Sequence, residues 1–267
     1  MRAVSLSQEP AFSTLQSHFV CGVKDISKEQ YAGVSRKHEE DGQAIKTTNG
    51  AGPHNLQVFM LSPDGTVLHC LPGYWDPRDL VYEMGLAWQL NQVWTDPSLS
   101  RSQKDQLFRQ MHLAHERQHP ADMVFRSRMQ SFDQKYEAKH RLLTSDTIRD
   151  PQLITASFAS AGRLPQAAFK TTDEIVHERM ALRPFLPFQE FDVASYVDYG
   201  RPLYDKHEDQ RNLSGQRVAF DRDGDKLIGN TDSMPGKRRA RRGGLGRYAM
   251  QRGLQYFIRH GVASSFR

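Results

Sequence analysis

The stretch LQVFMLSPDGTVLHCLPGYW, residues 56–75, holds two apolar runs on either side of Ser62-Pro63-Asp64-Gly65. Aspartate hydrogen-bonds to its own backbone and glycine tolerates left-handed backbone angles, so this tetrapeptide is typical of a turn. Apolar runs rich in Val, Phe and Leu that flank a short turn are typical of a β-hairpin. We therefore predict a hairpin whose first strand, from Val58 to Leu61, is largely buried.

A helix is predicted directly after the hairpin, because Asp76 is a good N-cap and Pro77 suits the first helical position. Behind them, apolar residues recur at helical spacing at Leu80, Val81, Met84, Ala87 and Trp88. Upstream, residues 5–18 indicate the end of a helix and residues 19–26 a strand. A capping-box pattern then predicts a helix from Ser27 to about Glu40. The predicted order is helix, strand, helix, strand, strand, helix.

This order, carried by FSTLQSHFVCGVKDI, by the hairpin and by the helix from Asp76, resembles the thioredoxin-like fold over residues 11–92. Gly73-Tyr74 matches the Gly-Tyr that family members carry near the end of the last strand. The resemblance implies an α/β domain with a sheet and flanking helices. The chain lacks Cys-x-x-Cys, which in the family precedes the first helix, so the motif is expected before Met1 or lost.

The family's cis-proline position falls at Asn55 or Leu56, with Pro53 out of register. Because both landmarks of the redox site are missing or displaced, the first function we expect is that of a divergent thioredoxin-like protein. Its thiol–disulfide activity would be weakened or lost, and its role would be binding or scaffolding.

The two cysteines, Cys21 and Cys70, exclude more than one disulfide and a zinc site built from several thiolates. Both lie in apolar, strand-like segments, which favours buried and inert thiols. A rival alignment places Cys21-Gly22-Val23-Lys24 at the redox motif, and Cys21 would then be the nucleophile of a single-cysteine oxidoreductase or peroxidase. Against this, the capping Ser27 puts Cys21 about six residues before the helix, where the helix dipole has faded.

Residues beyond 95 predict a mainly helical extension. Helices are expected at Ser100–Gln118 and Ala121–Leu143, with an abrupt joint at Pro120, and a further helix at Thr171–Leu182. Residues 221–225, Asp-Arg-Asp-Gly-Asp, fit a β-turn better than a calcium loop, because the glycine is at the fourth position rather than the sixth.

His115-Glu116-Arg117-Gln118-His119 matches H-E-x-x-H, in which two imidazoles on one helix face bind zinc and the glutamate acts as a base. Pro120 follows directly, where a zinc-binding helix normally continues, and no third ligand is signalled. His112 lies three residues earlier and completes a weak candidate metal set. We expect a solvated, histidine-bearing helix end without a metal, and a metal-dependent hydrolase is the least favoured of the three functions.

Charge divides the chain unevenly. Nine of the 36 Lys and Arg residues lie in residues 237–267, which hold no Asp or Glu, and the other 27 are outnumbered by 31 acidic residues. Such a basic cluster binds the phosphates of nucleic acids or anionic lipids electrostatically, and the alternative is a solvated segment. The residues expected to make these contacts are Lys237, Arg238, Arg239, Arg241 and Arg242.

Three parts are therefore expected: a thioredoxin-like domain at 1–95, a helical extension at 96–236 and a basic segment at 237–267. Composition favours a soluble protein, and no apolar run approaches the roughly 20 residues that span a bilayer. The N-terminal MRAVSLSQEPAF lacks the apolar core of a secretory signal. We expect either a cytoplasmic protein or one whose leader precedes Met1. No cofactor is predicted, and the expected partner is a protein of unknown identity.

Overall fold

The computed structural model describes residues 5–35, 47–159, 164–204, 219–220 and 226–227. The chain divides into two compact units, Met1–Leu213 and Ser214–Arg267. The first unit contains α1 (Ala11–His18), β1 (Val34–Ser35), β2 (Gln57–Leu61), β3 (Val67–Pro72), α2 (Pro77–Thr95), α3 (Arg101–Arg117), α4 (Ala121–Arg126), α5 (Ser131–His140), α6 (Pro151–Ala159), α7 (Thr172–Ala181), α8 (Val193–Tyr196) and β4 (Leu203–Tyr204). The second contains β5 (Ala219–Phe220) and β6 (Lys226–Leu227).

The predicted hairpin is confirmed. β2 and β3 pair antiparallel, with Met60 opposite His69 and an irregularity between Met60 and Leu61. The turn uses Gly65 at φ 85°, a conformation that suits glycine. The expectation that the first strand is largely buried was wrong. Every residue of β3 is buried, whereas β2 is mostly half-buried, because β3 packs against both α2 and α7.

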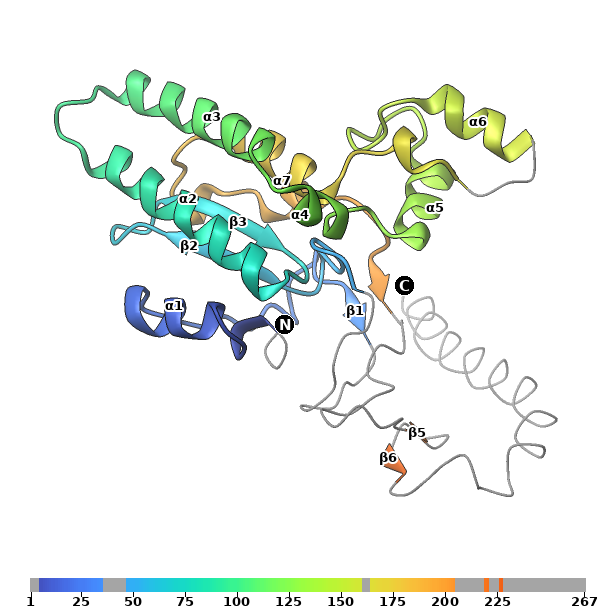
Figure 1. Ribbon diagram of the computed structural model, residues 1–267, viewed down its shortest axis with the longest axis horizontal. Helices are drawn as coiled ribbons and strands as arrows, with labels where there is room; N and C mark the ends of the chain where they lie inside the picture. Colours follow the sequence, from blue (N-terminus) through green and yellow to red (C-terminus); the bar gives the residue numbers. More distant parts are fainter. Residues whose placement is uncertain (1–4, 36–46, 160–163, 205–218, 221–225, 228–267) are drawn as a thin grey trace, which may run out of the picture. The chain divides into compact units, whose positions relative to one another are not determined.

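The helix after the hairpin is also confirmed. Asp76 caps α2 by accepting a hydrogen bond from the backbone N–H of Arg78, and Pro77 occupies the first turn. α3 begins with a capping box between Ser100 and Gln103, and it packs against both α2 and α7 (Figure 1). Large buried side chains fill the space between these elements: Trp75, Leu80, Phe108, Val176, Phe185 and Tyr196.

This one hydrophobic cluster joins residues on both sides of position 95, the predicted end of the first domain. Leu80 of α2, Phe108 of α3 and Val176 of α7 all belong to it. The hairpin and the helices that follow it therefore form a shared core.

The described strands form three two-stranded sheets: β1 with β4 (parallel), β2 with β3, and β5 with β6. The fold is mixed α/β, and these residues hold no larger sheet of the kind that the resemblance implies. Residues 19–26 were predicted as a strand, but they have no regular structure, and Val20 and Val23 are exposed. Without a neighbouring strand their backbone has no ladder to join. The helix predicted from Ser27 is not present through residue 35, and its remaining residues lie outside the described ones.

The helix predicted at Ala121–Leu143 is divided into α4 and α5. Its break falls at Ser127, whose buried carbonyl accepts hydrogen bonds from the backbone N–H and the hydroxyl of Thr172. A tertiary contact thus ends α4 where the sequence pattern continues.

In the second unit, β5 and β6 pair antiparallel on either side of residues 221–225. This pairing agrees with the predicted turn, although the turn residues themselves lie outside the described part. The basic residues from Lys237 to Arg242 also lie outside it.

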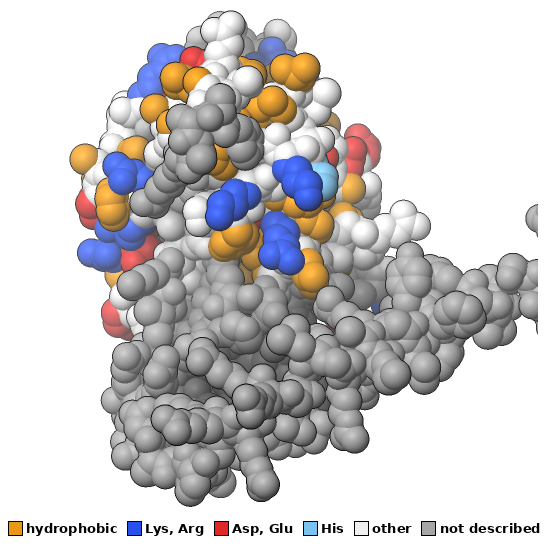
Figure 2. Space-filling model, turned by 90° about the vertical axis from the view of Figure 1, so that its right-hand side faces the viewer, with side chains coloured by type: hydrophobic (Ala, Val, Ile, Leu, Met, Phe, Trp, Pro, Cys, Tyr) orange, Lys and Arg blue, Asp and Glu red, His pale blue; other side chains and the backbone are white. Residues whose placement is uncertain are grey.

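None of the described helices combines the length and apolarity that a bilayer crossing needs. Figure 2 shows one face of the molecule, on which Lys and Arg side chains lie among hydrophobic ones. Such mixing is common on folded proteins, because polar atoms do not suffice to cover the surface.

Replacement of Leu71 by alanine should lower the free energy of unfolding by about 2–5 kcal/mol, because this fully buried leucine of β3 would leave a cavity. The control is Leu143→Ala, since Leu143 is 84% exposed and its loss should cost less than about 0.5 kcal/mol. Urea denaturation measures both. Equal losses would contradict the burial of β3.

Candidate metal centre

Glu83 of α2 is a fully buried carboxylate surrounded by imidazoles. Its Oε2 lies 2.9 Å from His69 Nε2 and 3.4 Å from His115 Nε2. Its Oε1 lies 3.2 Å from His119 Nε2 and 3.2 Å from His177 Nε2. The side chains of Glu83, His69, His119 and His177 are inaccessible to solvent, and that of His115 is 13% exposed.

Four elements deliver these side chains. β3 carries His69, α2 carries Glu83, α3 carries His115, and α7 carries His177. His119 follows the end of α3, where its ring remains beside Glu83. The site therefore exists because α2, α3, α7 and β3 share one core.

A chain of hydrogen bonds fixes the orientation of His177. His112 Nε2 lies 3.4 Å from the carbonyl oxygen of Leu68, which can only accept, so this nitrogen carries the proton. Burial and the neighbouring imidazoles hold the pKa of His112 well below its ordinary value, so the ring is neutral and Nδ1 is an acceptor. His177 Nδ1, 3.0 Å away, must donate to it. His177 Nε2 is then directed at Glu83.

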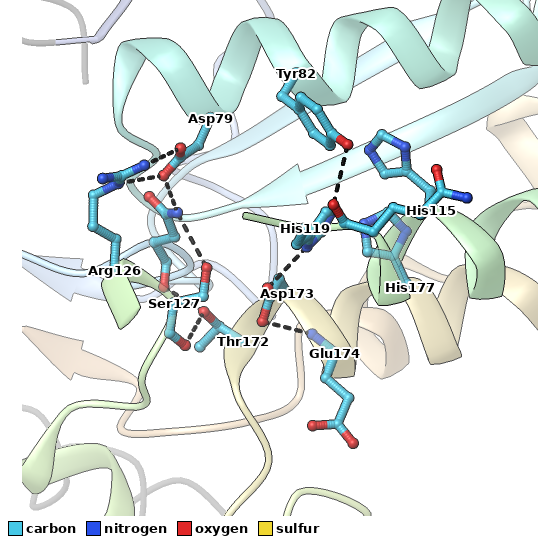
Figure 3. Close-up of polar contacts among 12 residues, drawn as sticks. Asp79, Tyr82, His115, His119, Arg126, Ser127, Thr172, Asp173, Glu174 and His177 are labelled. Carbon is cyan, nitrogen blue, oxygen red and sulfur yellow. Dashed lines mark hydrogen bonds and ion pairs between the residues drawn. The ribbon is translucent and has the colours of Figure 1, made fainter. Parts of the chain in front are cut away.

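His119 is held in a similar way from its other nitrogen. Its Nδ1 lies 2.9 Å from Asp173 Oδ2, and Figure 3 shows this contact beside the rings of His115 and His177. A carboxylate can only accept, so Nδ1 donates and Nε2 faces Glu83. Histidine ligands of metals are held by this kind of carboxylate contact.

Two of the ring nitrogens beside Glu83 are not aligned with its oxygens. His115 Nε2 and His119 Nε2 are buried and make no hydrogen bond, although they lie within 3.4 Å of the carboxylate. Buried nitrogens without an aligned hydrogen-bond partner are costly. Their convergence beside a carboxylate is the arrangement that a bound cation satisfies.

The charge at this site is negative without a cation. Burial alone would raise the pKa of Glu83, but the facing imidazoles hold it well below its usual value, so the carboxylate stays ionised. Burial would likewise lower the pKa of His119, yet the hydrogen bond to Asp173 and the Glu83 carboxylate raise it to about 9. A proton on His119 thus balances part of the charge when no metal is bound.

The atoms offered by Glu83, His115, His119 and His177 all lie within 4.8 Å of one another. Zinc binds nitrogen and oxygen ligands at about 2.0–2.2 Å, so two ligands of a tetrahedral ion lie about 3.4 Å apart. An inward movement of about 0.7 Å by each of the most distant atoms is enough for these residues to share one ion.

The H-E-x-x-H pattern contributes two of the four clustered residues. His115 and His119 both reach the cluster, but Glu116 does not belong to it, and the carboxylate comes from Glu83 instead. The expectation of a solvated helix end was wrong: His112 is fully buried, and so is the side chain of His119. His112 supports His177 rather than joining the four candidate ligands.

Sequence reasoning missed Glu83, Asp173 and His177. A usable signal was present in α2, where Glu83 lies next to Met84 on the face that also holds Leu80 and Ala87. An acidic residue in an apolar face needs a partner, because burying an unpaired charge is costly.

The cysteines differ from each other. Cys70 is buried, as predicted, and burial raises the pKa of its thiol well above the ordinary value. Cys21 was expected inside a strand or near a helix start, but it is exposed in a segment without regular structure. Neither cysteine belongs to the cluster around Glu83.

A second polar network holds the helices that carry the centre. Asp79, one turn before Glu83, accepts two hydrogen bonds from Arg126 at 2.8 and 2.6 Å and one from the side-chain amide of Asn49 at 2.7 Å. The side-chain carbonyl oxygen of Asn49 accepts a hydrogen bond from the backbone N–H of Asp76. This network ties the start of α2 to α4 (Figure 3).

The same network reaches α7. The hydroxyl of Thr172, the first residue of α7, lies 2.6 Å from the backbone carbonyl of Asn49 and 2.8 Å from that of Ser127. Since Asp173 and His177 follow Thr172 on this helix, the contact fixes their distance from Glu83.

Comparison of the chain with protein-family models, with curated proteins and with solved structures finds no match.

Asp79→Asn should lower the free energy of unfolding by about 3 kcal/mol, because it breaks a largely buried ion pair and leaves the Arg126 charge without its main partner. Asp122→Asn is the matched control. Asp122 also pairs with Arg126, but its side chain is 64% exposed, and such pairs contribute little. Thermal and urea unfolding compare the two, and a similar loss in both would refute the role of this network.

Proposed function

We propose that this protein is a metalloprotein that binds one divalent transition-metal ion through Glu83, His115, His119 and His177. The observation that carries the proposal is the convergence of imidazole nitrogens, two of them without hydrogen bonds, on a buried ionised carboxylate. A metal ion would satisfy these nitrogens and replace the proton that His119 otherwise holds.

The ligand set narrows the choice of metal. Imidazole nitrogens suit zinc, iron, copper and nickel, whereas calcium and magnesium prefer oxygen ligands. No thiolate contributes, because neither cysteine belongs to the cluster. Three imidazoles and one carboxylate therefore favour Zn²⁺, Fe²⁺ or Co²⁺ over Ca²⁺ or Mg²⁺.

Contacts outside the four ligands support the same proposal. His119 is held by Asp173, and His177 by His112 and through it by the backbone of Leu68. His69 lies 2.9 Å from the second oxygen of Glu83 and orients the carboxylate. Ligands of metal centres are oriented by contacts of this kind, which fix the tautomer of each histidine.

A thioredoxin-like origin remains a second, separate proposal about the fold. It is supported by the hairpin of β2 and β3 and by α2, whose positions match the resemblance in the sequence. A binding or scaffold role fits the burial of Cys70, and the exposure of Cys21 leaves a single-cysteine reaction as its alternative. The metal-dependent hydrolase is the reaction class that the proposed centre favours.

Protein purified without a histidine tag should contain stoichiometric metal or take up Zn²⁺ stoichiometrically. His115→Ala should abolish this binding, and His115 is the best ligand to replace because it is the least buried of the four. His140→Ala is the control, since His140 is exposed and outside the cluster. Metal analysis after gel filtration gives the ratio. Full binding by a folded His115→Ala protein would refute the proposed ligand set.

Asp173→Asn should weaken metal binding about 10- to 100-fold, because His119 would lose the charged acceptor at Nδ1. Glu174→Gln is the neighbouring control, since Glu174 pairs with Arg149 rather than with a ligand. Competition with a chromophoric chelator measures both affinities. Equal affinities of the two variants would show that Asp173 does not support the ligand.

A further inference from the structure

We infer that the centre keeps an exchangeable coordination position for water or a small anion, which opens on the side of His115 and Tyr82. This inference rests on the metal binding proposed above and adds what the ion does: it would bind an outside ligand rather than act as a closed structural brace.

The four ligands are shielded unequally. Glu83, His119 and His177 have no solvent-accessible side-chain surface, whereas that of His115 is 13% exposed. His115 Nε2 itself is buried, so among the four ligands His115 marks the side on which the site lies nearest to solvent. An ion with four protein ligands binds an outside ligand only by becoming five-coordinate, as catalytic zinc sites can do.

Tyr82 covers this side. Its ring stacks on His115 with 4.7 Å between ring centroids, and it meets His119 edge-on at 5.6 Å. Tyr82 is itself 37% exposed. Figure 3 shows Tyr82 near His115 and His119, and its hydroxyl donates to the backbone carbonyl of Gln118. That hydrogen bond is 3.4 Å long and exposed, so it holds the ring weakly. Rotation of one side chain would uncover the ligands.

Distances between the ligand atoms are compatible with a fifth position. His119 Nε2 and His177 Nε2 each lie 3.2 Å from Glu83 Oε1. Two atoms at this separation, each about 2.1 Å from one ion, subtend an angle of about 100° at that ion. This angle lies between the octahedral and the tetrahedral values, so it admits a five-coordinate ion for which the protein supplies four ligands.

Charge indicates the class of the outside ligand. A divalent ion bound by one carboxylate and three neutral imidazoles keeps a net charge of +1, which the Asp173 carboxylate behind His119 balances, so hydroxide or a small anion would bind through the ion itself. Among the described residues, the ring of Tyr82 and the backbone carbonyl of Gln118 line this side of the site. Glu83 is the only carboxylate of the described residues that contacts His115.

The test uses the full chain loaded with Co²⁺, whose visible absorption reports its coordination, and azide as the small anion. Stoichiometric Co²⁺ binding comes first and tests the proposed centre. Azide should then change the visible spectrum saturably while the cobalt stays bound through gel filtration. Tyr82→Ala should speed azide association at least about tenfold, whereas Tyr82→Phe should stay within about twofold of the unaltered protein, because the ring provides the cover.

Tyr136→Ala is the matched control, since Tyr136 lies against His140, a similar tyrosine–histidine pair outside the cluster, and it should leave the rate unchanged. A cobalt protein whose spectrum ignores azide, with or without Tyr82, would overturn the inference while the metal site stands. An azide response with the same rate in Tyr82→Ala would overturn entry at Tyr82. Failure to bind Co²⁺ would overturn both the centre and this inference.

Discussion

The burial of an ionised carboxylate, Glu83, is the constraint on which the arrangement of this core depends. Taking a charge out of water costs several kcal/mol unless partners compensate for it. The compensation here comes from four imidazoles. Three are carried by β3, α3 and α7, and the fourth belongs to His119, two residues beyond the end of α3. The packing of these elements on α2 is therefore constrained, because a shift of any of them would remove one of the partners of this charge.

Two networks share this task. The histidine cluster surrounds Glu83, and the contacts of Asp79, Arg126, Asn49 and Thr172 hold α2, α4 and α7 at fixed positions. The same helices also share a hydrophobic core that includes Phe108 and Val176. A metal ion bound at Glu83 would add its binding energy to the stability of the fold, because the ligands converge only when the chain is folded.

Sequence patterns predicted the parts of the fold that depend on local chemistry. The hairpin followed from the turn residues at 62–65, and the start of α2 from Asp76 and Pro77. The strand expected at 19–26 was wrong, because an apolar run becomes a strand only where another strand pairs with it. The division of α4 from α5 at Ser127 depends on Thr172, which lies far away along the chain.

The candidate site was predictable only where its residues lie close together in the sequence. His115 and His119 are close in sequence and gave a motif, although Pro120 argued against it. Glu83 and His177 join them from other helices, and no spacing in the chain signals that meeting. The available clue was a polar or charged residue on an otherwise apolar helix face. Its use requires knowledge of which faces are buried.

X-ray absorption of the zinc-loaded protein reports which atoms bind the ion and therefore tests the proposed ligand set. We predict a first shell of nitrogen and oxygen at about 2.0–2.2 Å, with outer-shell scattering from three imidazole rings. A first shell of oxygen without imidazole scattering, or one that contains sulfur, would contradict it.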